Sequence, residues 1–270
     1  MVDAITQYLE GGRLPWTAGY SKFKNRFIGQ TLADAVLLRR FANGERLPED
    51  FGDRLDERVV EYPWVLARLK TDGLILDAGS TFSSPLLLES PQLKGRRLII
   101  YTMMTDWITL DPNVSYMFGD FRDMLLRSDC VDAIACISTL EHVGLNYDYK
   151  VYNIDRHWLH QDVHAYRSVL AQFHRILKPG GQLLVTMPYG KYENHGWLQQ
   201  HDEASLDDVV AAWPGALAQA AYYRYCAGGW QVATAQECVG CAYWNIHHTP
   251  EYESDFAAAA RAVVCVEFRK

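Results

Sequence analysis

The chain has 270 residues and a formal net charge of −7, with 33 acidic side chains against 26 lysines and arginines. Hydrophobic residues make up 49% of it and charged residues 22%, a balance typical of a globular protein rather than a disordered chain. Because the surplus charge is negative, no overall field attracts phosphate backbones, and we expect no nucleic-acid partner.

No apolar run approaches the roughly 20 residues that a membrane-spanning helix needs. The first ten residues carry two acids and have neither a basic start nor an apolar stretch, so they do not resemble a secretory signal. The six cysteines are typical of reduced thiols in a chain of this length. We therefore expect a cytoplasmic protein without a membrane span.

The first 70 residues differ in pattern from the rest. An irregular stretch of aromatic and basic residues comes first, and a helical segment follows in which apolar residues recur near the 3.6-residue period. Those apolar residues are Leu32, Ala35, Val36, Leu38 and Phe41. A charged link then leads to a second expected helix, which ends near Leu69 and has Pro63 in its first turn. The pattern predicts a helical cap or lid over residues 1–70.

Residues 71–270 alternate between short apolar runs and segments long enough to form crossovers. The runs lie at residues 74–76, 98–100, 114–118, 131–137, 183–185, 222–225 and 263–268. Unbroken apolar strands are typical of a parallel sheet covered on both faces. The clearest helix spans residues 162–177 and is expected to stop at Lys178-Pro179-Gly180-Gly181. The pattern predicts an α/β fold with a doubly wound, mostly parallel sheet of seven strands.

Four segments resemble, in the same order, segments of the class I S-adenosylmethionine-dependent methyltransferases, the Rossmann-like family. They are Leu74-Ile75-Leu76-Asp77-Ala78-Gly79, Gly119-Asp120-Phe121-Arg122-Asp123-Met124, residues 131–143 ending in Leu140-Glu141-His142-Val143, and residues 173–181 ending in Lys178-Pro179-Gly180-Gly181. The resemblance covers about residues 72–190. It implies a Rossmann-like sheet, S-adenosyl-L-methionine as cofactor and methyl transfer to a small-molecule acceptor.

The resemblance also implies which residues hold the cofactor. They are Asp77, Gly79, Ser80, Thr102, Asp120, Phe121 and Ser138. Gly79 would let the backbone pass close to the cofactor, because glycine has no Cβ. Asp120 would accept a hydrogen bond from the adenine amine while Phe121 covers the ring.

Two departures from the family pattern affect the expected cofactor site. The glycine turn keeps only its first glycine, Gly79, and the second strand ends in Tyr101-Thr102 where the family has an acid for the ribose hydroxyls. Thr102 or Asp106 would have to substitute. These departures favour an alternative reading, a catalytically degenerate methyltransferase fold that serves as a binding or scaffolding subunit. An NAD-dependent oxidoreductase is disfavoured because the turn lacks the glycines that admit a pyrophosphate.

The candidate catalytic residues are Glu141 and His142, which follow the fourth strand of the resemblance. A hydroxyl acceptor needs a base, and an imidazole is suited to proton transfer near neutral pH. We therefore expect His142 to act as the base and Glu141 to orient the substrate or the cofactor. The alternative is that the pair caps the following helix or fixes a loop.

The expected acceptor is a hydroxyl of a sugar, a glycan or a secondary metabolite. Residues 189–200 are polar and aromatic, which suits a polyhydroxylated ligand. The closest resemblance, to methyltransferase-like proteins of polysaccharide and secondary-metabolite assembly, implies the same acceptors. An N- or C-methyltransferase would use the same core. The oligomeric state is left open, a homo-oligomer included.

Two groups of potential metal ligands are weighed against simpler explanations. His157, His160 and His164 lie near the start of the long helix, where solvated histidines are the commoner case, so we expect no metal. Cys238 and Cys241 form one Cys-x-x-Cys pair without a clear second pair, which is a weak zinc signal. We expect buried or incidental thiols there.

Overall fold

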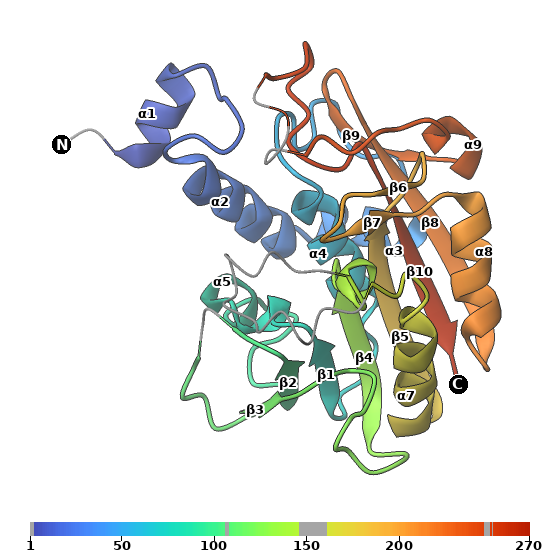
Figure 1. The fold of residues 1–270 in the computed structure, drawn as a ribbon. Helices are drawn as coiled ribbons and strands as arrows, with labels where there is room; N and C mark the ends of the chain where they lie inside the picture. Colours follow the sequence, from blue (N-terminus) through green and yellow to red (C-terminus); the bar gives the residue numbers. More distant parts are fainter. Residues whose placement is uncertain (1–2, 106–107, 146–160, 246–248, 250) are drawn as a thin grey trace.

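The computed structural model describes residues 3–105, 108–145, 161–245, 249 and 251–270. Its centre is a sheet of eight described strands in the order β3-β2-β1-β4-β5-β10-β8-β9 (Figure 1). The strands are β1 (Ile75–Ala78), β2 (Leu98–Thr102), β3 (Val114–Phe118), β4 (Val131–Ile137), β5 (Leu177–Pro188), β8 (Ala216–Cys226), β9 (Gly229–Ala233) and β10 (Ala262–Arg269). A small separate hairpin pairs β6 (Glu193–Asn194) with β7 (Gln199–Gln200).

Strands β1 to β5 are parallel, and β10 runs antiparallel between β5 and β8. From β1 the chain moves outward through β2 to β3 and then returns to β4 on the other side of β1. Such a reversal opens a crevice at the carboxyl ends of the central strands, where ligands of α/β proteins bind. The expected α/β class with a mostly parallel, doubly wound sheet is confirmed, and all seven expected strands form.

The eighth strand, β9, extends the sheet beyond β8. Gly228, in the short turn before β9, and Gly229, the first residue of β9, have φ values of +90° and +101°, a region that favours glycine. The two glycines reverse the chain, so that β9 pairs antiparallel with β8. The sequence analysis did not include this strand.

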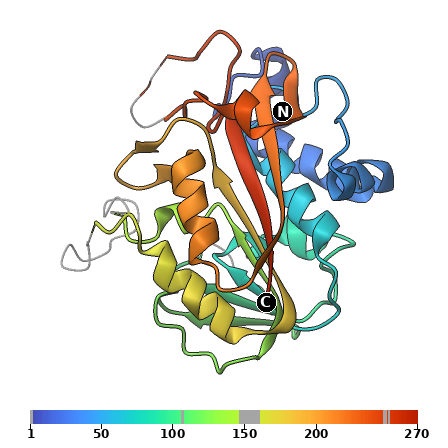
Figure 2. The same cartoon turned by 90° about the vertical axis from the view of Figure 1, so that its right-hand side faces the viewer.

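The described helices lie on both faces of the sheet (Figure 2). They are α1 (Ala4–Glu10), α2 (Tyr20–Ala33), α3 (Ala35–Asn43), α4 (Arg58–Arg68), α5 (Pro85–Leu88), α7 (Tyr166–Ile176), α8 (Glu203–Ala212) and α9 (Ala235–Cys238), with 3-10 turns η1 (Thr81–Ser83) and η2 (Leu140–His142). Within the ranges that the structure describes, no helix is long and apolar enough to cross a bilayer.

Three local expectations about the helices differ from the structure. The first expected helix is broken at Asp34, the residue after the end of α2. The side chain of Asp34 caps α3 by accepting hydrogen bonds from the amides of Val36 and Leu37. Pro63 lies in the middle of α4 rather than in its first turn, because the helix already starts at Arg58. The breaker after α7 is not a free turn, because Leu177 to Gly181 are the first residues of β5.

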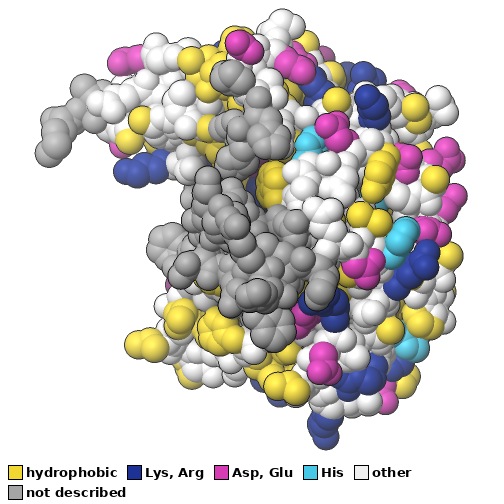
Figure 3. Space-filling view, in the orientation of Figure 1, with side chains coloured by type: hydrophobic (Ala, Val, Ile, Leu, Met, Phe, Trp, Pro, Cys, Tyr) yellow, Lys and Arg dark blue, Asp and Glu magenta, His cyan; other side chains and the backbone are white. Residues whose placement is uncertain are grey.

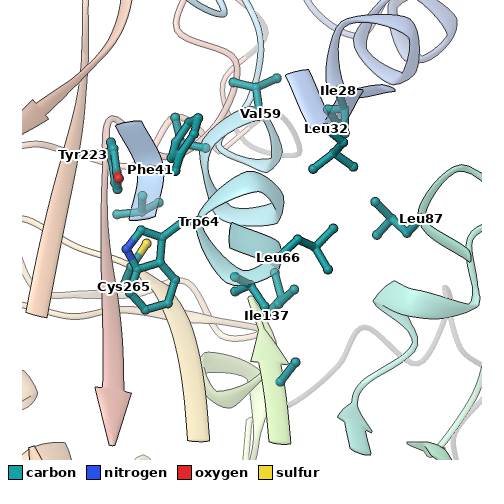
Figure 4. Packing of buried hydrophobic residues seen from close by; sticks show 14 of the residues in the cluster. Ile28, Leu32, Phe41, Val59, Trp64, Leu66, Leu87, Ile137, Tyr223 and Cys265 are labelled. Carbon is teal, nitrogen blue, oxygen red and sulfur yellow. The ribbon is translucent and has the colours of Figure 1, made fainter. Parts of the chain in front are cut away.

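The N-terminal helices and the sheet share one buried core. Trp64 of α4 is fully buried, and Figure 4 shows it beside Cys265 of β10, with Phe41 of α3 next to Tyr223 of β8. The Phe41 and Tyr223 ring centroids are 5.6 Å apart. Burying side chains of this size stabilises the fold by about 1.5–3 kcal/mol each. Helix α4 is therefore fixed to the sheet, which determines where its first turn lies.

Several large apolar side chains are exposed at the β3 end of the sheet. They include Met103, Ile108, Leu110, Phe118 and Leu125, of which Leu110 is 97% exposed. Figure 3 shows apolar side chains gathered at the lower left, where Figure 1 places β3. Exposed apolar surface of this kind is uncommon on a soluble monomer when it is contiguous.

Candidate active site

The carboxyl end of β1 holds a buried acid and a glycine in an unusual conformation. One carboxylate oxygen of Asp77, Oδ2, accepts a 2.7 Å hydrogen bond from the amide of Phe82, while Oδ1 is buried and has no partner among the described residues. Burial raises the pKa of Asp77 to about 7. Gly79 has φ +133°, and a Cβ there would lie 2.7 Å from Oγ1 of Thr139. The exits of β1 and β4 therefore lie in close contact.

The exit of β4 is bonded to helix α4. Ser138 has φ +42°, and its amide donates to the carbonyl oxygen of Thr186 at 3.1 Å. Its hydroxyl donates to Oε1 of the fully buried Glu61 at 3.0 Å. Helix α4 thus contributes a side chain to the edge of the sheet at which the sequence analysis placed the cofactor.

The side chain of Glu141, in the turn η2, is 1% exposed. Its Oε2 has no hydrogen-bond partner among the described residues, and its Oε1 lies 3.9 Å from Nε2 of His142. Burial raises the pKa of Glu141 to about 8, and the negative charge of Glu61 acts in the same direction. An ionised Glu141 is therefore a strong proton acceptor for a carboxylate.

The imidazole of His142 has a defined tautomer. Nδ1 lies 2.8 Å from the carbonyl oxygen of Trp197, and since a carbonyl only accepts, Nδ1 carries the hydrogen. The lone pair is then on Nε2, the nitrogen nearer Glu141. The ring stacks on Trp197 with centroids 5.2 Å apart. Burial lowers the pKa of His142 to about 4, so the imidazole is neutral at pH 7 and a weak base.

Helix α4 begins with charged groups that sequence reasoning did not identify as functional. The guanidinium of Arg58 pairs with Glu61 and lies 3.7 Å from Oε1 of Glu57. Glu57 is 4% exposed, and burial raises its pKa to about 7. The charges of Arg58 and Glu61 also act on Glu141. We call Glu57, Arg58, Glu61 and Glu141 the carboxylate–arginine cluster.

A further acid ties this region to the N-terminal helices. Oδ2 of Asp56 accepts hydrogen bonds from the hydroxyl of Tyr20 at 2.9 Å and from Nζ of Lys24 at 2.5 Å. Lys24 also lies over the ring of Trp16, at 5.1 Å from its centroid. The indole of Trp16 in turn donates to the carbonyl oxygen of Ala258. These contacts fix α2 beside the start of α4.

The expected residues for the ribose and adenine are less well placed than Asp77 and Gly79. The hydroxyl of Thr102 donates to the carbonyl oxygen of Met104 at 2.6 Å, so its hydrogen bond is made within its own loop. Phe121 is 7% exposed and packs in the core between two aromatic rings. Asp106 lies outside the described residues. Ser80 is half-buried beside Gly79, and its carbonyl oxygen accepts from Ser83.

Asp120 stays near the surface and is held by Arg122. Nε of Arg122 lies 3.0 Å from both carboxylate oxygens, and Nη2 lies 2.6 Å from Oδ2. Burial opposes ionisation of Asp120, but the hydrogen bonds from Arg122 outweigh it and lower the pKa. Its carboxylate is therefore ionised at neutral pH and keeps free accepting capacity.

The polar segment at residues 189–200 is mostly structural where it is buried. The amide of Gln199 donates to the carbonyl oxygen of Val163, and that of Gln200 donates to the carbonyl oxygens of Lys191 and Cys241. Both amide groups therefore donate to backbone carbonyls. The expected reading of sugar hydroxyls by glutamines has no support in these contacts.

The weaker metal and thiol signals have simple structural counterparts. His157 and His160 lie outside the described residues, while Nδ1 of His164 lies 3.3 Å from the hydroxyl of Tyr166. The residues that the structure describes contain no group of three or more ligands arranged for a metal. Cys238 and Cys241 are buried, unbridged thiols.

Arg58 and Glu61 were not among the site residues expected from the sequence, although one feature of the sequence points to them. They stand three positions apart at the start of an otherwise apolar helix, where charged side chains must find partners if they are buried. That pattern indicates a buried ion pair. It does not indicate which strand the pair contacts.

Sheet and site together define the chain as a protein with the Rossmann-like methyltransferase fold: a parallel sheet that reverses at β1, an antiparallel strand between β5 and β8, and polar residues gathered at the exits of β1 and β4. The sequence itself matches no family model and no curated protein.

Solved structures similar to this chain include several methyltransferases, all at low identity. One is the 1,6-didemethyltoxoflavin-N1-methyltransferase of Burkholderia thailandensis, with 14% identity over 76% of this chain and 74% of that chain and a TM-score of 0.46. Another is a putative methyltransferase of Bacillus halodurans, with 13% identity, coverage of 75% and 94%, and a TM-score of 0.47. A third is the N-methyltransferase NodS of Bradyrhizobium japonicum, with 12% identity, coverage of 92% and 98%, and a TM-score of 0.43.

Proposed function

We propose that the protein is an S-adenosylmethionine-dependent methyltransferase that acts on a small-molecule acceptor. The observation that carries the proposal is the carboxyl end of β1, where Oδ1 of the buried Asp77 has no described partner and Gly79 follows two positions later with φ +133°. A buried acid with an unsatisfied oxygen is costly unless a ligand supplies a donor. The ammonium of the cofactor's methionine part is such a donor, so the residues present fit this part of the cofactor.

The remaining cofactor contacts follow from the same edge. Gly79 would let the backbone approach the ligand, and Ser80 and Ser138 would meet it because they follow the ends of β1 and β4 at the same edge. Asp120 is ionised and accessible, so it accepts from the ribose or the adenine. Thr102 contributes through the position of its loop, since its hydroxyl is taken by Met104. Phe121 supports this end from the core. When bound, the cofactor supplies a methyl group activated by its sulfonium.

Glu141 and His142 handle the acceptor's proton in this proposal. Glu141 is the stronger proton acceptor, because burial raises its pKa to about 8 while burial lowers that of His142 to about 4. His142 holds the turn by its bond to Trp197 and presents Nε2 toward Glu141. The roles expected from sequence are thereby exchanged. A sugar, glycan or secondary-metabolite hydroxyl and an amine both release a proton, so both are compatible with this pair.

The first 70 residues act as a cap over the site in the same proposal, and residues 71–270 form the methyltransferase domain. Support comes from α4, which places Arg58 and Glu61 at the exit of β4, and from Asp56, which holds α2 beside them. The cap would then form one wall of the acceptor site.

A second candidate function, a degenerate fold that binds without methylating, is favoured by two observations. Thr102 is turned into its own loop, and Phe121 is packed in the core instead of standing free for an adenine. Both reduce the contacts offered to the ribose and adenine.

Calorimetric titration with S-adenosylmethionine and S-adenosylhomocysteine separates the two functions. We expect micromolar affinity, about −8 kcal/mol, and a loss of at least about tenfold in Asp77→Asn. Asp207→Asn, which changes an exposed acid on α8, is the matched control and should bind normally. If the wild-type protein binds neither ligand at millimolar concentration, the degenerate fold is the correct reading.

A further inference from the structure

We infer that the acceptor is a cationic amine and that Glu141 of the carboxylate–arginine cluster is the group that recognises it. The inference rests on the proposed function, since it names the substrate class of the same site. It is carried by the composition of the cluster and by the contacts that its members make.

The cluster contains more buried carboxyl groups than it has charged partners for. Arg58 is its one cation, and it pairs with both Glu57 and Glu61. Glu61 also accepts from the hydroxyl of Ser138. Glu141 is 1% exposed, yet its Oε2 has no hydrogen-bond partner among the described residues. The site is therefore short of one charged donor.

The neighbouring cations do not fill this position. Lys24 is bound to Asp56 at 2.5 Å, and that acid also accepts from Tyr20. His142 donates its one hydrogen to the carbonyl oxygen of Trp197 and is neutral. Among the residues that the structure describes, no cation takes this position, which leaves it to a positively charged ligand.

Charge distinguishes an amine from a hydroxyl at this place. A hydroxyl would satisfy one hydrogen bond of Glu141 but would not offset the charge of its ionised form. An ammonium supplies both the hydrogen bond and the charge. Burial raises the pKa of Glu57 to about 7 and that of Glu141 to about 8, so a positive charge placed beside them would favour their ionised forms.

Aromatic rings beside the cluster suit the same ligand. Trp197 stacks on His142, and Tyr243 meets Trp197 edge-on with centroids 6.5 Å apart. Burial, together with the negative charges of Glu57 and Glu141, raises the pKa of Tyr243, which places its ring within their field. The faces of such rings attract cations. The amide groups of Gln199 and Gln200, which suit a hydroxyl, donate instead to backbone carbonyls.

The reaction balances with these groups. The bound ammonium gives one proton to Oε2 of Glu141, and the nitrogen lone pair forms a bond to the transferred methyl carbon. The bond from that carbon to sulfur breaks, and the sulfur keeps the electron pair. The products are the N-methylated amine, S-adenosylhomocysteine and a protonated Glu141, which releases its proton to solvent after the amine leaves.

The test uses three matched pairs of ligands with the full chain, saturated with S-adenosylhomocysteine at pH 8.5. The pairs are benzylamine and benzyl alcohol, ethanolamine and ethylene glycol, and cyclohexylamine and cyclohexanol. We expect one or more amines to bind at least tenfold more tightly than the matched alcohol in calorimetric titration. Glu141→Gln should remove this preference and leave the affinity for S-adenosylhomocysteine unchanged. Glu203→Gln, an exposed acid of α8, should retain it.

Every outcome of these titrations either supports or overturns the inference. The inference is overturned if the alcohols bind as tightly as the amines, if none of the six ligands binds, or if Glu141→Gln keeps the preference. In those cases binding of S-adenosylhomocysteine leaves the proposed function standing. If S-adenosylhomocysteine itself does not bind, the proposed function fails first and the inference falls with it.

Discussion

The hydroxyl of Ser138 donates to the buried carboxylate of Glu61 at 3.0 Å and so joins the exit of β4 to the first turn of α4. Ser138 has φ +42°, a conformation that costs about 1–3 kcal/mol for a residue other than glycine. The bond to Glu61 and the two bonds from its amide to Thr186 hold it there. The turn that carries Glu141 and His142 therefore depends on a helix more than 70 positions earlier.

Two substitutions at Ser138 separate its hydrogen bond from its backbone strain. Ser138→Ala loses the bond to Glu61 but keeps the strain, so we expect it to destabilise the fold by about 1–3 kcal/mol. Ser138→Gly also loses the bond but relieves the strain, so it should cost less. Urea denaturation measures both. A larger loss in the glycine variant than in the alanine variant would contradict this account.

Gly79 offers a test of close packing between the exits of β1 and β4. Gly79→Ala places a Cβ 2.7 Å from Oγ1 of Thr139 and also meets an unfavourable φ of +133°. We expect a loss of about 2 kcal/mol or more in stability and weaker binding of S-adenosylhomocysteine.

Gly95→Ala is the matched control for Gly79→Ala. Its φ is +74°, but nothing lies within 4 Å of the new Cβ, so it should show only the backbone strain. Adding Thr139→Ala to Gly79→Ala should recover part of the loss by removing the clash. Equal effects at the two glycines would show that packing against Thr139 is unimportant.

The proton acceptor can be identified from the pH dependence of methyl transfer. With Glu141 as acceptor, the rate should rise with pH and level off above about 8, the raised pKa of that carboxyl. His142→Ala should reduce the rate and keep this midpoint, whereas Glu141→Gln should remove it. The alternative, His142 as the base, predicts a rate that has already levelled off by pH 6, since its pKa is about 4.

The free energy of unfolding should fall as pH rises through the pKa of Asp77. An ion-paired acid, whose pKa is lowered, has the opposite effect. The pKa of Asp77 in the folded protein is about 7, above the ordinary value of 3.8, because the carboxyl is buried. The contribution of Asp77 is therefore full below about pH 4 and is lost as pH rises through 7. Asp77→Asn should lack this loss and gain about 1 kcal/mol or more relative to the wild type between pH 5 and 8. Denaturation at several pH values gives the difference, and a constant difference would contradict it.

Strand positions could be predicted from the sequence because the inner strands are buried on both faces and read as unbroken apolar runs. β9 could not, because its five residues are only partly apolar and partly buried. The segment from Lys178 to Gly181 ends the helix as expected, but the sequence did not show that it already belongs to the sheet. Glycine and proline usually end a helix freely, but here Gly180 donates to the carbonyl oxygen of Lys270 and the segment joins the sheet.

Part of the candidate site could likewise be predicted from the sequence, and part could not. The position of Asp77, Gly79, Glu141 and His142 at one edge of the sheet could be predicted, because chain order places the exits of parallel strands there. The partners from α4 could not, because their position depends on how that helix packs through Trp64 against β10. The protonation states also needed the structure, since the roles of Glu141 and His142 depend on burial.

The shared core of α4 and the sheet has a consequence for engineering. Trp64 and Val60 are fully buried, in one core with strand residues such as Ile137 and Cys265. A chain shortened to begin at residue 71 would expose the apolar face of the sheet that α4 covers. It would also lack Arg58 and Glu61. The N-terminal segment is therefore not an exchangeable module. Transplanting a new acceptor specificity would require replacing α4 and its docking residues on the sheet together.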